Sequence, residues 1–391
     1  MVNISNLFQL IIILGGGGAL INKGIPLNNF IYLISLLSIW LLPYMLAFNK
    51  CVGGSIRTLF ILLTATVLLT IKTKSLLLFY VFFEFSLVPI TCIVYLYGYQ
   101  PEKIHAAIAL LLYTVVSRLP LLLFIVYCEL SFKISVALTI PITLRFIVKS
   151  PMFILHTWLP KAHVEAPVGG SMVLAGVLLK LGSYGLMIFL PFLKLNVLMT
   201  FYLSISLLGS VVCSFICLRS RDLKLLIAYS SVVHIRVVTL GFISRREIGF
   251  TCGLIIIIGH GLGSPFLFAL AYWIYISSHS RIIINNTRMN PLLMLRIFGL
   301  VTLNMGVPPR LNVWAEVFLA LSLLSLMSSS ITLFILILFL GGAYNFYLFT
   351  SCIHGKFSES NKRIVPIHHL SIYQVLFYGY SAFFCLDIFH V

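Results

Sequence analysis

Charged residues are scarce in this sequence, and acidic residues are the scarcest of them. Only 9% of the 391 residues are charged, with 9 Asp and Glu against 26 Lys and Arg. Soluble domains carry about 25% charged residues, so the composition excludes a fold with a water-exposed surface. Hydrophobic residues reach 61%, which at roughly 20 residues per span is enough for about thirteen membrane crossings. The sequence therefore predicts an all-α polytopic membrane protein.

Patterns that hold metals, nucleotides or redox centres are also missing. The 8 cysteines are scattered without a C-x-x-C pair, so iron–sulfur and zinc sites have no support. The glycine runs at 15–18 and 259–263 lack the strand–turn–helix context of a phosphate loop. His156 and His163 have no convergent partners at metal-ligand spacing, and Lys161, His163 and Glu165 are more typical of a polar connector. We therefore expect this chain to bind no cofactor and no metal.

The excess of basic residues gives a formal net charge of +17. Basic residues gather in short connectors such as 72–74, 219–224 and 245–246. Positive connectors set the orientation of membrane proteins and contact anionic lipids. The charge therefore favours lipids as partners and argues against nucleic acid.

Two of the predicted membrane spans are interrupted by proline. Pro141 and Pro151 lie in the sixth span, and Pro308 and Pro309 lie in the eleventh. Proline removes a backbone donor, and lipid offers the freed carbonyl no other partner, so such breaks occur beside protein or a water-filled cavity. Paired breaks in corresponding halves indicate inverted repeats of a transporter, although kinks that serve only packing are the alternative. The predicted spans are 4–21, 27–48, 56–71, 75–97, 104–127, 135–159, 167–190, 197–218, 223–240, 248–276, 292–327, 331–349 and 369–389.

Ionisable side chains interrupt several of these apolar spans. A charge at bilayer depth costs roughly 2.5–3.5 kcal/mol on insertion scales, and residues kept at that cost usually serve ion or proton transfer. Glu84 is predicted to pair with Lys149, because the other lysines lie in different contexts. Lys180 has no carboxylate within four residues, which favours a lysine that exchanges protons. The candidate proton-path residues are Glu84, Lys149, Lys180, His234, His260 and Glu316.

Each of these residues also has a structural interpretation. Glu84 and Lys149 can form an ion pair that only holds helices together, although buried pairs add little net stability. Lys180 can snorkel to the interface, although about a dozen apolar residues precede it in its span. His234 and His260 can be hydrogen-bonded core residues instead of proton relays.

Several motifs match one known family. HTWLPKAHVEAPVGGSMVLAGVLLKLGSYG is followed by RDLKLLIAYSSVVH, GHGLGS and GVPPRLNVWAE. In this order they resemble the chain 4 family of NADH–ubiquinone oxidoreductase, the antiporter-like subunits of respiratory complex I. The resemblance covers about residues 75–348. Mrp-type cation/proton antiporter subunits share the ion-path residues but match less of these sequence motifs.

The resemblance implies a subunit of the proton-translocating NADH:ubiquinone reductase in the mitochondrial inner membrane. NADH, FMN, iron–sulfur clusters and ubiquinone would belong to other subunits, and the partners would be other membrane-arm subunits. Glu84 and Lys149 then look like a coupling ion pair, and Lys180 like the central proton carrier. His234 and His260 look like polar-axis residues, and Glu316 like the distal acid. The implied regions are N-terminal helices at 1–74, an antiporter-like core at 75–350, and a connector with the last helix at 351–391.

Two other functions stay open alongside this one. A free-standing Mrp-type antiporter subunit would transport sodium without quinone reduction. A structural membrane spacer would tolerate neutral substitution of Glu84 and Lys180.

The chain departs from the family pattern in two ways. Three predicted spans precede the one that carries Glu84, where the family typically has four. Arginines also stand where the family has serine or another small residue, and isoleucine is plentiful while Met numbers only 10. Both biases would follow if a mitochondrial gene were translated with the wrong code table, and this is our hypothesis. The arginines concerned are Arg118, Arg145, Arg236 and Arg310.

Overall fold

The protein is a bundle of helices in this computed structural model. The structure describes residues 27–49, 54–73, 75–130, 145–190, 196–283, 291–307, 311–324, 326 and 330–354. Within those ranges the backbone forms helices and turns, with one isolated β-bridge between Asp222 and Ile282. The predicted all-α class is confirmed. The first and last predicted spans, 4–21 and 369–389, lie outside the described residues, and the three proposed regions stay a prediction.

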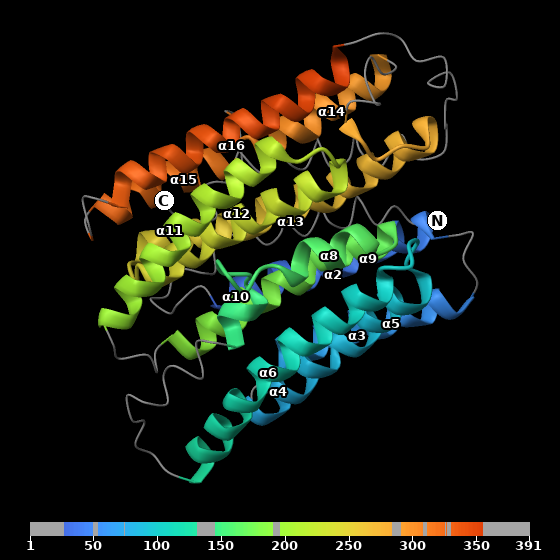
Figure 1. Ribbon diagram of the computed structural model, residues 1–391. Coiled ribbons are helices and arrows are strands. Elements are labelled where there is room, and N and C mark those ends of the chain that lie inside the picture. Colours follow the sequence, from blue (N-terminus) through green and yellow to red (C-terminus); the bar gives the residue numbers. More distant parts are fainter. Residues whose placement is uncertain are drawn as a thin grey trace, which may run out of the picture.

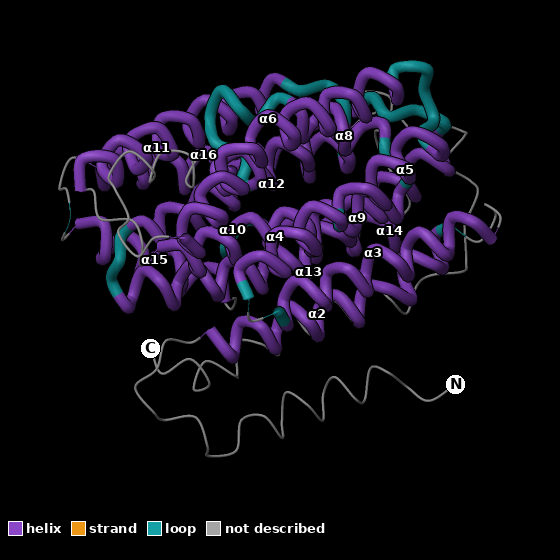
Figure 2. Tube along the Cα trace, turned by 90° about the horizontal axis from the view of Figure 1, so that it is seen from below, coloured by secondary structure: helices purple, strands orange, loops and turns teal. Residues whose placement is uncertain are grey.

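The helices fall into two groups that follow each other along the chain (Figure 1). The first group comprises α2 Leu27–Phe48, α3 Gly54–Lys72, α4 Leu76–Phe85, α5 Leu87–Tyr97, α6 Lys103–Leu130, α8 Trp158–Glu165, α9 Val168–Val173, η2 Leu174–Leu178 and α10 Leu179–Phe189. The second comprises α11 Asn196–Arg219, α12 Leu223–Ile243, α13 Glu247–Ser278, α14 Pro291–Asn304, α15 Leu311–Leu324 and α16 Ser330–Ile353. Figure 2 shows the same helices running side by side in a second view.

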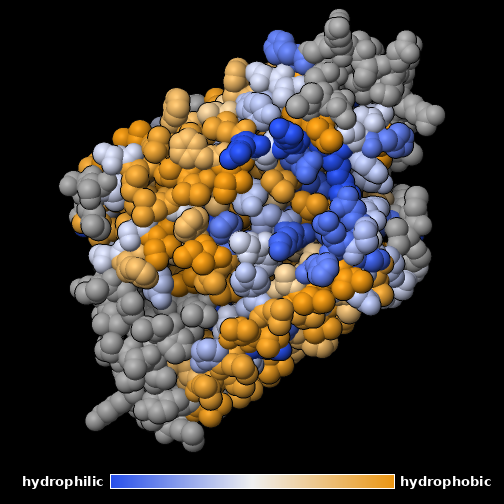
Figure 3. Space-filling view, in the orientation of Figure 1, coloured by the Kyte–Doolittle hydropathy of each residue, from blue (hydrophilic) through white to orange (hydrophobic). Residues whose placement is uncertain are grey.

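Helices that are apolar on every side occupy the centre of this bundle. Nine helical segments in the described ranges are long and apolar enough to cross a membrane. The segment from α9 to α10 and helix α12 each have 94% of their apolar window buried by protein, against 33% for α6 and α16. A helix that is hydrophobic all round is stable only when protein or lipid surrounds it. Apolar residues also cover much of the outer face, and hydrophilic residues gather over one part of it (Figure 3).

Both predicted helix breaks are present. Residues 145–149 are helical, the chain then turns through residues 150–157, and α8 begins at Trp158. The second break separates α14 from α15, and Gly306 there has a φ of 62°, a left-handed value that glycine adopts without steric cost. Pro308 and Pro309 lie outside the described residues. These breaks place non-helical backbone inside the bundle, next to the ionisable residues.

Candidate functional site

Lys180 lies in the first turn of α10, directly after one turn of π-helix, η2. The wider π turn alters the usual backbone hydrogen bonding, and such turns are frequent at functional sites. The Lys180 ammonium donates to the carbonyl of Ala175, and its Nζ lies 2.8 Å from Nδ1 of His260. Lys180 is only 2% exposed, so it does not snorkel to the surface. The lysine is therefore held inside the protein with a histidine as its side-chain partner.

Two histidines from neighbouring helices meet at this lysine. His260 on α13 and His234 on α12 have ring centroids 5.4 Å apart. The hydroxyl of Ser264 lies 3.4 Å from Nδ1 of His260, and Nε2 of His234 has no hydrogen-bond partner among the described residues. A small cavity opens between the three helices, and its lining consists of Lys180, Ser183, His234, Ile235, Val238, Ile257 and His260. The structure thus brings together three predicted proton-path residues.

The direct ion pair predicted between Glu84 and Lys149 is wrong. The Glu84 carboxylate on α4 accepts a hydrogen bond from Nη2 of Arg145 and lies 3.8 Å from Nη1 of Arg118. Lys149 instead points to Phe83, with Nζ 3.2 Å from the ring centroid and 3.3 Å from the backbone oxygen. Arg145 precedes Lys149 by four residues, so both cations project from the same side of a helical turn. Arg145 therefore takes the position next to Glu84 that the sequence assigned to Lys149.

Lys149 nevertheless lies beside the helix that carries Lys180. A Cβ atom added to Gly182 on α10 would lie 3.1 Å from the backbone carbon of Lys149 and 3.3 Å from its Cβ. Only glycine allows the two backbones to approach this closely. The first break therefore packs directly on α10 at Gly182, two residues after Lys180.

Glu316 lies apart from the cavity around Lys180, against the second break. A Cβ atom on Gly306 would lie 2.7 Å from Oε2 of Glu316, so the carboxylate occupies the space that this glycine leaves open. The predicted position of Glu316 at a broken helix is confirmed. Among the described residues, Glu316 makes no direct contact with the other predicted proton-path residues.

Two further polar residues, which the sequence analysis missed, lie near Glu316. Asn312 precedes Glu316 by four residues on α15, is 3% exposed, and its Oδ1 has no hydrogen-bond partner among the described residues. Its side chain fills the space beside Gly259, the residue before His260 on α13. The buried hydroxyl of Tyr344 on α16 also lacks a partner in the described part, and Tyr344 lies within electrostatic range of Glu316. The i,i+4 spacing of Asn312 and Glu316 was the signal available in the sequence.

The buried arginines differ in how well their charge is compensated. Arg145 is fully buried and donates to Glu84, to Ser117 Oγ at 2.8 Å and to the Thr114 carbonyl at 3.0 Å. Arg236 is also fully buried, but it forms no ion pair with a described residue. Its partners are the Pro151 carbonyl at 3.1 Å and Cys213 Sγ at 3.2 Å, and its Nη2 has none among the described residues. Arg310 lies outside the described residues.

The chain matches a known family over most of its length. A family model described as NADH:quinone oxidoreductase/Mrp antiporter, TM, matches residues 73–343. NADH-ubiquinone oxidoreductase chain 4 of Ceratitis capitata is 40% identical over 349 residues, which cover 83% of this chain and 78% of the relative. The protein of the same name from Mytilus edulis is 35% identical over 392 residues, which cover 91% of this chain and 88% of the relative.

Solved structures share the fold at lower identity. A chain of respiratory complex I from Thermus thermophilus with bound NADH superposes with a TM-score of 0.85 at 22% identity, covering 98% of this chain and 90% of that chain. A chain of the Mrp complex from Dietzia sp. DQ12-45-1b gives a TM-score of 0.74 at 17% identity, covering 84% of this chain and 67% of that chain. At these identities the likeness shows the fold alone.

Proposed function

Because this chain belongs to the NADH:quinone oxidoreductase/Mrp antiporter family, we propose that it carries protons across the mitochondrial inner membrane as a membrane-arm subunit of respiratory complex I. The named relatives are chain 4 proteins, so its partners are other membrane-arm subunits. Proton transfer is driven by electron transfer from NADH to ubiquinone. NADH, FMN, the iron–sulfur clusters and ubiquinone are assigned to other subunits.

The contact between Lys180 and His260 carries this proposal. Their nitrogens lie 2.8 Å apart in a cavity shared with His234, a distance at which a proton on Nζ can pass to Nδ1. Lys180 is buried and has no carboxylate partner among the described residues, so nothing local holds its proton permanently. We assign Lys180 as the residue that takes up and releases the transported proton, with the two histidines as relays.

In this proposal the Glu84–Arg145 pair controls the charge beside Lys149, whose backbone packs against Gly182 on the helix that carries Lys180. Opposite charges about 4 Å apart interact by about 4 kcal/mol at an effective dielectric near 20, which corresponds to about a 1000-fold change in a proton equilibrium. When the Glu84 pair opens, the uncompensated positive charge next to Lys149 favours release of the proton from Lys180 across the Gly182 contact. A serine at position 145, as our code-table hypothesis has it, would leave Lys149 to compensate Glu84 directly.

From His260 the proton moves along α13 and α15 to Glu316. Asn312 lies against Gly259, one residue from His260, and four residues before Glu316. Its unpaired Oδ1 is an acceptor for a water molecule between the two residues. Glu316 at the second break then releases the proton.

A free-standing Mrp-type antiporter subunit is the second candidate, because the Mrp complex shares the fold. That protein would transport sodium and would not depend on quinone reduction. The higher identity with chain 4 proteins favours complex I. Co-purification of the chain with a large NADH-oxidising assembly distinguishes the two.

The test is a Lys180→Met variant in the complete complex, reconstituted into liposomes. Methionine has a similar length and no titratable group, so the complex should assemble and oxidise NADH while the proton-to-electron ratio falls. The control is Lys161→Met, because Lys161 is an exposed residue of α8. An unchanged ratio in Lys180→Met would refute the role of this lysine.

A further inference from the structure

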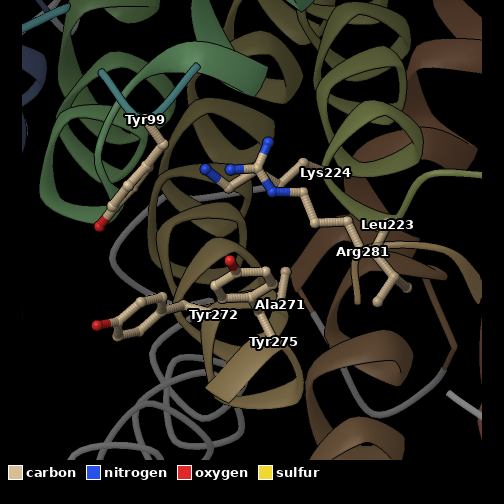
Figure 4. Close-up of a pocket in the computed structure, with 7 residues that line it drawn as sticks. All are labelled: Tyr99, Leu223, Lys224, Ala271, Tyr272, Tyr275 and Arg281. Carbon is tan, nitrogen blue, oxygen red and sulfur yellow. The ribbon is translucent and has the colours of Figure 1, made fainter. Parts of the chain in front are cut away.

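A second pocket lies away from the proton path, where the ends of three chain segments meet (Figure 4). Tyr99 follows α5, Lys224 lies in the first turn of α12, and Arg281 follows α13. A backbone hydrogen bond of 3.1 Å from Leu223 to the Arg281 carbonyl joins two of these segments. The lining of the pocket consists of Tyr99, Leu223, Lys224, Ala271, Tyr272, Tyr275 and Arg281.

Both cations in this lining lack an acidic partner. Lys224 is 5% exposed, and its ammonium donates to the carbonyls of Ala166 at 3.1 Å and Val164 at 3.4 Å. Arg281 stacks over Tyr275, with its guanidinium carbon 5.6 Å from the ring centroid. Neither cation forms an ion pair with a described Asp or Glu. Burying a cation such as Lys224 without a counter-charge costs several kcal/mol, so an anion in this pocket would be stabilised.

The carboxylate of Glu165 compensates these cations only in part. Glu165 at the end of α8 lies within electrostatic range of both Lys224 and Arg281, but it does not line the pocket. Burial raises the pKa of the Glu165 carboxyl, an effect that Arg281 and Lys224 oppose and Glu102 adds to. The lining of the pocket itself holds two cations and no carboxylate.

We propose that this pocket binds the phosphate of an anionic phospholipid headgroup. The arginine fork and the lysine point charge match phosphate oxygens. Basic pockets between transmembrane helices are known to take lipid headgroups, and tyrosines are enriched at headgroup depth.

Apolar surface next to the pocket favours a lipid over a free phosphate ion. Tyr99 is 55% exposed, as is Leu96, which lies three residues earlier on α5. Ile282, the residue after Arg281, is 42% exposed. Acyl chains of a bound lipid would cover these side chains, whereas an inorganic ion would leave them bare. The site is independent of the proton path, since none of its lining residues borders the Lys180 cavity.

The test measures phospholipid retained by the purified complex after detergent washing, by mass spectrometry. Lys224→Gln and Arg281→Gln should each lower retention of phosphatidylglycerol or cardiolipin about fivefold, and the double variant more than tenfold. Lys161→Gln should retain the wild-type amount, and Lys224→Arg should recover most of it. Equal retention in the wild type and the double variant overturns the proposal.

A second measurement uses the wild-type complex, so it does not depend on whether the variants assemble. It also separates the two sources of phosphate. The wild-type complex is delipidated and incubated with phosphatidylglycerol or with inorganic phosphate, and density between Lys224 and Arg281 is examined by cryo-electron microscopy. Density with phosphatidylglycerol alone supports the lipid site. Density with inorganic phosphate alone, or with neither, overturns it.

Discussion

Replacing Gly259 by alanine tests the link between His260 and Glu316. A Cβ atom at Gly259 would lie 2.9 Å from Cγ of Asn312, whereas carbon atoms in good contact are about 3.5–4.0 Å apart. The Asn312 side chain must therefore move, or α13 and α15 must separate. Such overpacking costs about 1–3 kcal/mol.

The Gly259→Ala variant should lower the thermal stability of the complex and slow proton translocation. Gly342→Ala is the matched control, because no atom lies within 4 Å of a Cβ placed there. Adding Asn312→Ala to Gly259→Ala removes the clash, so stability should recover by about 1–3 kcal/mol as a coupling term. Proton translocation should stay slow, because the water-binding amide is gone.

Thermal melting and NADH-driven proton uptake in liposomes measure the two effects separately. Wild-type melting together with wild-type proton uptake in Gly259→Ala would refute the close packing of Gly259 on Asn312. Full recovery of proton uptake in the double variant would show that only the steric fit matters there, and not the amide.

Three further changes test the surrounding residues. Glu84→Gln should leave Arg145 buried without a carboxylate, lower the free energy of unfolding by about 3–5 kcal/mol and reduce assembly of the complex on native gels. Normal assembly would contradict this ion pair, and it is the result expected if residue 145 is serine. The peptide that contains Arg236 should show serine there in mass spectrometry, because this arginine is fully buried with no acidic partner among the described residues. An observed arginine would refute the code-table hypothesis. Tyr344→Phe removes a buried hydroxyl that has no hydrogen-bond partner among the described residues, so the free energy of unfolding should be unchanged or rise by up to about 1 kcal/mol; a lower melting temperature would show that the hydroxyl is bonded.

The sequence alone determined most of the apolar helices and two of the helix breaks. Apolar helices are local features, since an apolar run of the right length must be helical in lipid. Proline by itself did not decide the breaks, because Pro43, Pro120 and Pro265 lie inside continuous helices. Predicted spans at 27–48 and 167–190 coincide closely with α2 and with the segment from α9 to α10. The burial of Lys180 also followed from its depth in such a run.

Only the tertiary structure decided which ionisable groups meet. Glu84 contacts Arg145 across 61 residues, and Lys180 contacts His260 across 80. Such contacts depend on the rotation and crossing of whole helices, and two cations one turn apart are equally good partners in a sequence. The packing of Asn312 on Gly259 of α13, on which its proposed place in the path rests, appears only in the tertiary structure, because close packing of two helices depends on both of them.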